Sequence, residues 1–139
     1  AAKLGANFTI ANPADYDMPT QAIETVKPIA AASGSKLNFL RDPHEAVKGA
    51  HVIYTDTWTS MGQEEESAKR ELVFPPYQVN DQLVAEADPE VIVMHCLPAH
   101  RNQEITDEVA DGPHSRLFPQ AHNRLHAQKA ILQTLLGEK

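Results

Sequence analysis

The chain has 139 residues, about the length of one domain, and 42% of them are apolar, which is typical of a globular protein. The net charge is −7 and no basic cluster is longer than Lys69-Arg70, so we expect no nucleic-acid partner. No apolar run approaches the roughly 18 residues that cross a bilayer, and we see no signal or transit peptide, so we expect no membrane association. The single cysteine, Cys96, excludes an intramolecular disulfide and suits a reducing compartment.

Apolar segments of strand length alternate with amphipathic stretches along the whole chain. The candidate strands are residues 7–11, 37–41, 51–55, 90–95 and 116–118. Two of these strands contain continuous apolar runs, which are typical of parallel strands covered on both faces. The pattern therefore predicts a Rossmann-like, layered α/β domain with a doubly wound and largely parallel sheet.

The expected helices are marked by capping residues and prolines. Helix starts are predicted at Pro19, Asp42, Asn80 and Thr106, and the longest helix at about 119–136. The acidic run at residues 64–66 is typical of the first turn of a helix, where the dipole favours negative charge.

The first five residues, Ala1-Ala2-Lys3-Leu4-Gly5, resemble the last turn of a helix with its glycine stop. This start predicts a domain that lacks its first strand. We therefore expect the chain to be a fragment of a longer polypeptide.

In open parallel sheets, ligands bind beyond the carboxyl ends of the strands, so the residues directly after each strand carry most weight. The segment 56–64 follows one apolar strand with the carboxylate of Asp56, three hydroxyl side chains and Gly62. Composition alone favours an ordinary surface loop, in which Trp58 packs against the core and Asp56 caps the turn. A ligand site is the alternative.

A second polar segment, His95-Cys96-Leu97-Pro98-Ala99-His100-Arg101, ends the strand at 90–95. A thiol beside an imidazole is a candidate nucleophile or proton acceptor, because a nearby cation can lower the pKa of a thiol from about 8.5. The alternative is that Cys96 is a small buried apolar residue, which is common for free cysteine.

Metal and nucleotide sites have weaker support. His122 and His126 lie one helical turn apart, a spacing that can chelate zinc, but the only thiol is distant in sequence and such pairs are usually solvated. The chain contains no G-x-G-x-x-G or P-loop pattern. We therefore expect no structural zinc, and the sequence gives no evidence of a nucleotide site.

Taken together, three motifs resemble ornithine carbamoyltransferases. These are Asp56-Thr57-Trp58-Thr59-Ser60-Met61-Gly62-Gln63-Glu64, His95-Cys96-Leu97-Pro98 and Asn123-Arg124-Leu125-His126-Ala127-Gln128-Lys129-Ala130. The similarity runs through the whole chain. The chain resembles only the C-terminal, ornithine-binding half of such an enzyme. The carbamoyl-phosphate domain, with its Ser-Thr-Arg-Thr-Arg motif, is expected to be absent.

The resemblance implies transfer of a carbamoyl group from carbamoyl phosphate to L-ornithine, giving citrulline and phosphate without a cofactor. It places Asp56, Ser60 and Met61 against ornithine. The parent would be a cytoplasmic homotrimer that serves arginine biosynthesis.

The same resemblance places Cys96, Leu97 and Arg124 against carbamoyl phosphate and marks Cys96 as catalytic. An alkyl ammonium has a pKa of about 10.4, so its proton must be accepted before the amine attacks. Asp56 and a Cys96 thiolate at adjacent strand ends would be suitable acceptors, and the guanidinium of Arg124 suits phosphate. One departure is His122, where the family usually has Glu.

Two other functions remain open at this stage. A related carbamoyltransferase could use another amine, such as putrescine, and turnover by the parent protein would distinguish it. A non-catalytic amino-acid-binding module could retain the loops without chemistry. The reading frame upstream of Ala1 would discriminate the module from the enzyme.

Overall fold

The computed structural model describes residues 1–59, 62 and 64–137 of the chain. They form a mixed α/β fold with parallel strands, as the sequence predicts. The chain divides into two compact units, Ala1–Lys48 and Gly49–Lys139. None of the described helices is both long and apolar enough to cross a membrane.

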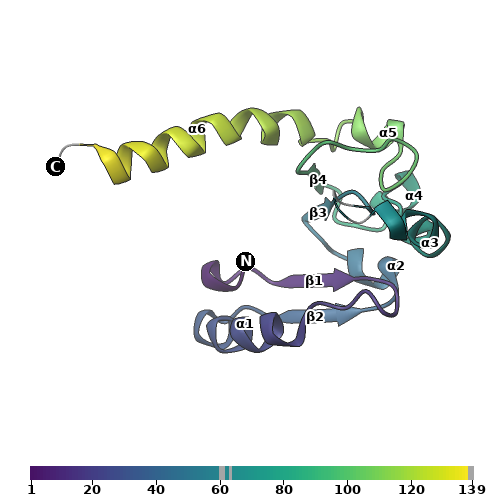
Figure 1. Cartoon of the computed structure of the whole chain (residues 1–139), viewed down its shortest axis with the longest axis horizontal. Helices are drawn as coiled ribbons and strands as arrows, with labels where there is room; N and C mark the ends of the chain where they lie inside the picture. Colours follow the sequence, from purple (N-terminus) through teal and green to yellow (C-terminus); the bar gives the residue numbers. More distant parts are fainter. Residues whose placement is uncertain (60–61, 63, 138–139) are drawn as a thin grey trace. The chain divides into compact units, whose positions relative to one another are not determined.

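The first unit is a parallel strand pair with a connecting helix (Figure 1). β1 (Phe8–Ala11) pairs with β2 (Leu37–Leu40), and α1 (Thr20–Ser33) connects them. Helix α1 tolerates Pro28 in its interior and ends at Gly34, whose φ of 81° is left-handed and therefore favours glycine. These elements lie close to the predicted segments.

Short elements complete this unit. The opening residues form a single 3-10 turn, η1 (Ala2–Leu4), which ends at Gly5 with a φ of 73°. α2 (Pro43–Val47) begins after Asp42, whose carboxylate accepts the backbone N–H of His44. The predicted N-cap at Asp42 is therefore confirmed.

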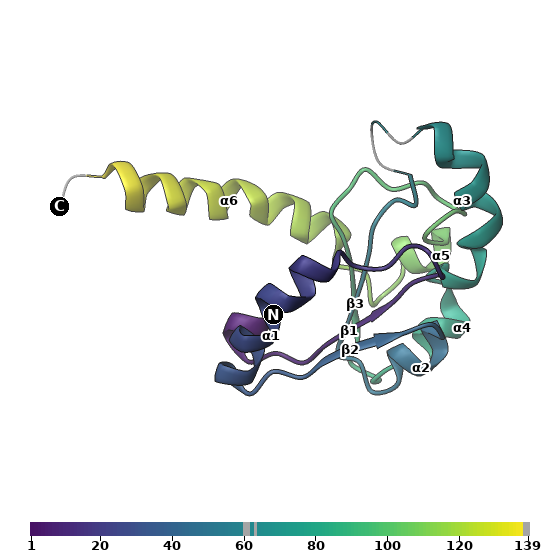
Figure 2. The same cartoon turned by 60° about the horizontal axis from the view of Figure 1, so that its bottom comes forward.

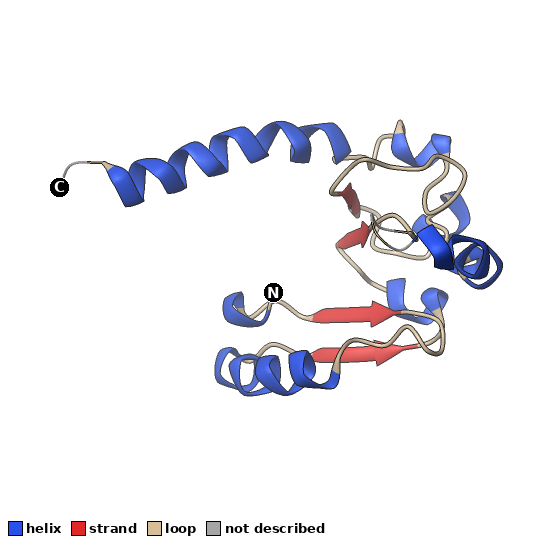
Figure 3. Cartoon of the chain, viewed as in Figure 1, coloured by secondary structure: helices blue, strands red, loops and turns tan. Residues whose placement is uncertain are grey.

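The second unit contains the other parallel pair, coloured red in Figure 3. β3 (Val52–Thr55) pairs with β4 (Ile92–His95), in a register that places Thr55 opposite His95. The connection between them contains η2 (Glu64–Glu66), α3 (Ser67–Val73), η3 (Pro75–Tyr77) and α4 (Asp81–Val84). Asn80 caps α4 by accepting the backbone N–H of Leu83, as predicted.

In the remaining chain, α5 (Asp107–Ala110) packs against α4, and the start of α6 (Leu117–Leu136) packs against β4. The core of this unit is apolar and consists of side chains with 4% or less exposure: Val79, Leu83, Val91, Val93, Ile105, Val109, Ala110 and Leu117. Beyond its first turn α6 is exposed, and it extends as a long helix in Figure 2.

One sequence-based expectation about the strands is wrong. The strand expected at 116–118 is a single parallel bridge between Val93 and Ser115, after which α6 begins at Leu117. Pro119 fits the first turn of a helix, where its missing N–H has no role. The other four strands form two parallel pairs, β1–β2 and β3–β4, so the expected parallel pairing is confirmed.

Candidate active site

The pairing of β3 with β4 brings the two predicted polar segments together. Because Thr55 and His95 are register partners at the carboxyl ends of parallel strands, the next residues, Asp56 and Cys96, leave the same edge of the sheet. The Cys96 thiol donates a hydrogen bond to Asp56 Oδ1 across 3.0 Å. A carboxylate and a thiol that are 40 positions apart in the chain thus meet at one point.

The surroundings of Cys96 favour the protonated form of its thiol. Burial raises the pKa of the Cys96 thiol above its ordinary value, and the hydrogen bond to Asp56 and the charge of that carboxylate raise it further. The Tyr54 hydroxyl acts in the opposite direction. Since an unperturbed thiol already titrates above pH 7, this direction favours the thiol form of Cys96, which donates to the Asp56 carboxylate.

This arrangement predicts a high thiol pKa that depends on Asp56. The pKa of Cys96, measured from the pH dependence of its alkylation, should exceed the ordinary cysteine value of about 8.5. Asp56→Asn should lower it but leave part of the rise, because burial remains. A wild-type pKa at or below the ordinary value, or one that does not change in the variant, would contradict the proposed pairing.

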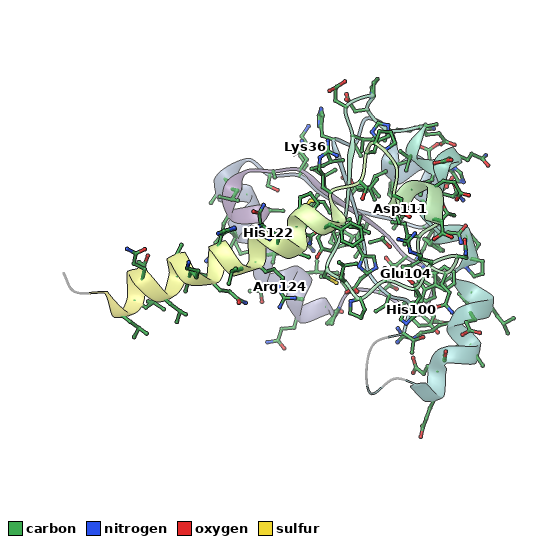
Figure 4. All side chains as sticks on the ribbon, turned by 90° about the horizontal axis from the view of Figure 1, so that it is seen from above. Lys36, His100, Glu104, Asp111, His122 and Arg124 are labelled. Atoms are coloured by element: carbon green, nitrogen blue, oxygen red, sulfur yellow. The ribbon has the colours of Figure 1, made fainter. Side chains whose placement is uncertain are left out.

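A buried histidine and glutamate lie behind this pair. The side chains of His95 and Glu104 are both 0% exposed, and His95 Nε2 lies 3.1 Å from Glu104 Oε1. His95 Nδ1 accepts the backbone N–H of Leu97 at 2.8 Å, so the ring proton is on Nε2 and donates to the glutamate. Glu104 Oε1 also accepts the backbone N–H of His100 at 2.6 Å (Figure 4).

These hydrogen bonds shape the backbone that carries Cys96. Leu97 has a φ of 57°, in the left-handed region that a leucine rarely adopts. A residue in such a conformation must be stabilised by its surroundings, and the N–H of Leu97 is held by His95, whose own ring is held by Glu104. The predicted contact residue Leu97 therefore owes its position to two buried side chains.

The segment after β3 is anchored on both sides of residues 60–63. Trp58 is nearly buried and packs against Phe74, with ring centroids 6.1 Å apart. Arg70 of α3 donates to the carbonyl of Trp58 at 2.7 Å and to the carboxylate of Glu66 at 2.9 Å. The structural role anticipated for Trp58 is thus present beside the polar site. The predicted ornithine contacts Ser60 and Met61 lie outside the described residues.

One further contact joins the two polar segments, and another lies within the segment after β3. The Thr57 hydroxyl lies 3.1 Å from His100 Nδ1, which links the loop after β3 to the loop after β4. Asp56 Oδ1 accepts the backbone N–H of Thr57 at 2.8 Å, as a turn-capping carboxylate would. Asp56 therefore caps the turn after β3 and also contacts the Cys96 thiol.

Helix α6 is anchored to the strand ends by Gln120. Its side chain accepts the backbone N–H of His95 at 3.0 Å and donates to the Tyr54 hydroxyl at 3.2 Å. Arg124 follows four residues later, so it lies one turn further along the same face of the helix. Its side chain is exposed and makes no side-chain hydrogen bond or ion pair within the part of the chain that the structure describes. A permanent cation is thus available beyond the edge that carries Cys96.

A metal ion fits this centre poorly. Potential ligand atoms of Asp56, His95 and Cys96 lie within 4.8 Å of one another. Both ring nitrogens of His95 already form hydrogen bonds, and the thiol proton is donated to Asp56. A metal would have to displace one of these bonds, so the arrangement favours a ligand that exchanges protons or hydrogen bonds with Asp56.

The sequence analysis missed Glu104, Gln120 and Arg70. Glu104 is 9 positions from His95, Arg70 is 12 from Trp58 and Gln120 is 25 from His95, and these spacings follow no local pattern. An acidic residue in a short loop is normally exposed, so nothing in the sequence marks Glu104 as buried.

Comparison with known proteins identifies the family of this chain. Residues 1–135 match the family model described as aspartate/ornithine carbamoyltransferase, Asp/Orn binding domain. The chain belongs to this family of transferases. It is 55% identical over 139 residues to an ornithine carbamoyltransferase of Archaeoglobus fulgidus, and 52% identical over 135 residues to that of Bacillus subtilis.

Solved structures agree with this assignment. The ornithine carbamoyltransferase of Pyrococcus furiosus matches with a TM-score of 0.89 and 51% identity, over 95% of this chain and 42% of that one. The Archaeoglobus and Bacillus relatives are covered over 44% and 42% of their lengths, by 100% and 97% of this chain. The chain thus spans less than half the length of the relatives it matches.

Proposed function

We propose that this chain is the ornithine-binding half of an ornithine carbamoyltransferase, here called the parent enzyme, in which a carbamoyl-phosphate-binding domain precedes Ala1. The contact between Cys96 and Asp56 carries this proposal, because it provides a proton acceptor at the edge of the sheet where a ligand would bind. The curated relatives, which bear this enzyme's name, support the choice of substrate.

The reaction requires a free amine. The δ-ammonium of L-ornithine transfers one proton to the Asp56 carboxylate, and the amine nitrogen then attacks the carbonyl carbon of carbamoyl phosphate. A C–N bond forms and the C–O bond to phosphate breaks. Phosphate leaves with that electron pair and accepts the second proton from the nitrogen. General-base assistance of this kind contributes about 10²- to 10⁴-fold in rate.

Cys96 acts as a neutral donor in this mechanism. Because its pKa is raised, the thiol keeps its proton and orients the Asp56 carboxylate toward the amine. His95 and Glu104 hold Leu97, whose backbone lies beside the carbamoyl group. Ser60 and Met61 complete the ornithine contacts. The proposed parent is a homotrimer of the cytoplasm. The family resemblance supports both properties, and the single cysteine fits a reducing compartment.

Arg124 binds the phosphate in this proposal. Arg124→Ala in the parent enzyme should weaken carbamoyl phosphate by about ten- to a hundredfold, since a hydrogen bond to a charged group is worth about 1.5–3 kcal/mol. Titration of carbamoyl phosphate measures the change, and the matched control is Arg116→Ala, because the guanidinium of Arg116 donates to backbone carbonyls at the start of the same helix. An unchanged dissociation constant in Arg124→Ala would contradict the assignment.

The chain alone should form no measurable citrulline, because the proposed domain for carbamoyl phosphate is not part of it. The experiment compares the purified chain with the parent enzyme in an assay of citrulline formation. Turnover by the chain alone at a rate near that of the parent would show that both substrates bind within these 139 residues, contrary to the proposal.

A further inference from the structure

Two histidines on α6 face each other at the helix surface. His122 Nε2 and His126 Nε2 lie 3.1 Å apart, and the centroids of the two rings are 4.9 Å apart. Both side chains are exposed. No step of the proposed reaction uses either of them.

The separation of the two nitrogens matches the bite of a metal chelate. Zinc binds imidazole nitrogen at about 2.0–2.1 Å. When the N–Zn–N angle lies between a right angle and the tetrahedral angle, the two nitrogens are about 2.9–3.3 Å apart. The observed distance falls in this interval without any change of side-chain conformation. Imidazole is a preferred ligand of Zn²⁺, Cu²⁺ and Ni²⁺.

We propose that His122 and His126 form a bidentate surface site for a divalent transition-metal ion. The two ring nitrogens supply the protein ligands, and water fills the other coordination positions because the surroundings are exposed. Without metal, one ring donates its proton to the other. With metal, both present lone pairs, so binding needs both rings neutral and ends the hydrogen bond between them.

The site is independent of the phosphate role of Arg124. Residues two positions apart on a helix point in nearly opposite directions, and His122 and Arg124 lie on opposite sides of α6 in Figure 4. Lys129, one turn beyond His126, adds positive charge near the site and lowers its affinity for a metal cation. Two protein ligands and a nearby cation define an exchangeable site and not a structural one.

Titration with Ni²⁺ at neutral pH, followed by isothermal calorimetry, tests this site in the unmodified chain and in His122→Gln and His126→Gln. Each substitution should weaken the strongest binding step by at least about tenfold, because a chelate exceeds its single ligands by about 10²- to 10⁴-fold. The matched control is His51→Gln, because His51 is also an exposed histidine, with the Asp88 carboxylate 3.8 Å away. This control should bind Ni²⁺ as the unmodified chain does.

Three results would overturn the inference. They are Ni²⁺ binding that is unchanged in both α6 variants, a loss of equal size in His51→Gln, and a loss produced by Cys96→Ser instead, which would move the ion to the cluster at Asp56. A melting curve of each variant shows whether the fold is intact. Since both histidines are exposed, the substitutions should leave the melting temperature of the metal-free chain unchanged.

Discussion

Asp56→Asn in the parent enzyme is expected to lower the turnover number for citrulline by at least about a hundredfold, on the scale of a lost general base. The substitution keeps the shape of the side chain and an oxygen that can accept from the backbone N–H of Thr57 and from the Cys96 thiol. It removes only the negative charge that accepts the ammonium proton. The melting temperature should therefore change little, because Asn satisfies turns and caps as well as Asp does.

The matched control for this experiment is Asp88→Asn. Asp88 also accepts a backbone N–H through Oδ1, from Glu90 at 2.8 Å, and it precedes β4 instead of following β3. The same chemical change at Asp88 should leave turnover unaltered. A normal turnover number in Asp56→Asn would remove its catalytic role and leave it as a turn-capping residue.

Glu104→Ala is expected to reduce the free energy of unfolding by about 2–6 kcal/mol, because two buried N–H donors lose their acceptor at a cost of about 1–3 kcal/mol each. The substitution leaves His95 Nε2–H and the backbone N–H of His100 without their acceptor in a fully buried place. It also frees the histidine ring that holds Leu97 in its left-handed conformation. Turnover should fall as well, because Cys96 and Leu97 lose their defined position.

Glu104→Gln separates charge from packing in this cluster. Gln keeps an oxygen for the two N–H groups, so its loss of stability should be smaller than that of Ala. Glu108→Ala is the matched surface control, since Glu108 lies exposed on α5 and should change stability by less than about 0.5 kcal/mol. Urea denaturation of the parent enzyme measures all three variants. Equal midpoints for Glu104→Ala and Glu108→Ala would contradict the buried role.

Local patterns in the sequence predicted most of the elements of the fold. The apolar runs located β3 and β4, and the caps at Asp42 and Asn80 form the hydrogen bonds expected of them. Local patterns do not specify which strands pair, so the pairs β1–β2 and β3–β4 could not be read from the sequence. The strand expected at 116–118 is instead the start of α6. Ser115 pairs with Val93 in a single bridge, and the helix begins two residues later at Leu117.

The candidate site was partly predictable from the sequence. Parallel pairing brings the ends of β3 and β4 to one edge, so the meeting of Asp56 and Cys96 follows from two strand ends. The state of the thiol does not, because its pKa depends on burial and on the nearby carboxylate. The support from Glu104 is also not readable from the sequence, since it depends on tertiary burial of a charged residue.

Citrulline formation by the parent enzyme, measured with L-ornithine and in parallel with putrescine, tests the proposed function most directly. The account predicts that carbamoyl phosphate and L-ornithine give citrulline and phosphate in equal amounts, with a kcat/KM for ornithine well above that for putrescine. Preferential carbamoylation of putrescine would contradict ornithine as the substrate. Binding of ornithine with no turnover of either amine would contradict the enzymatic role itself.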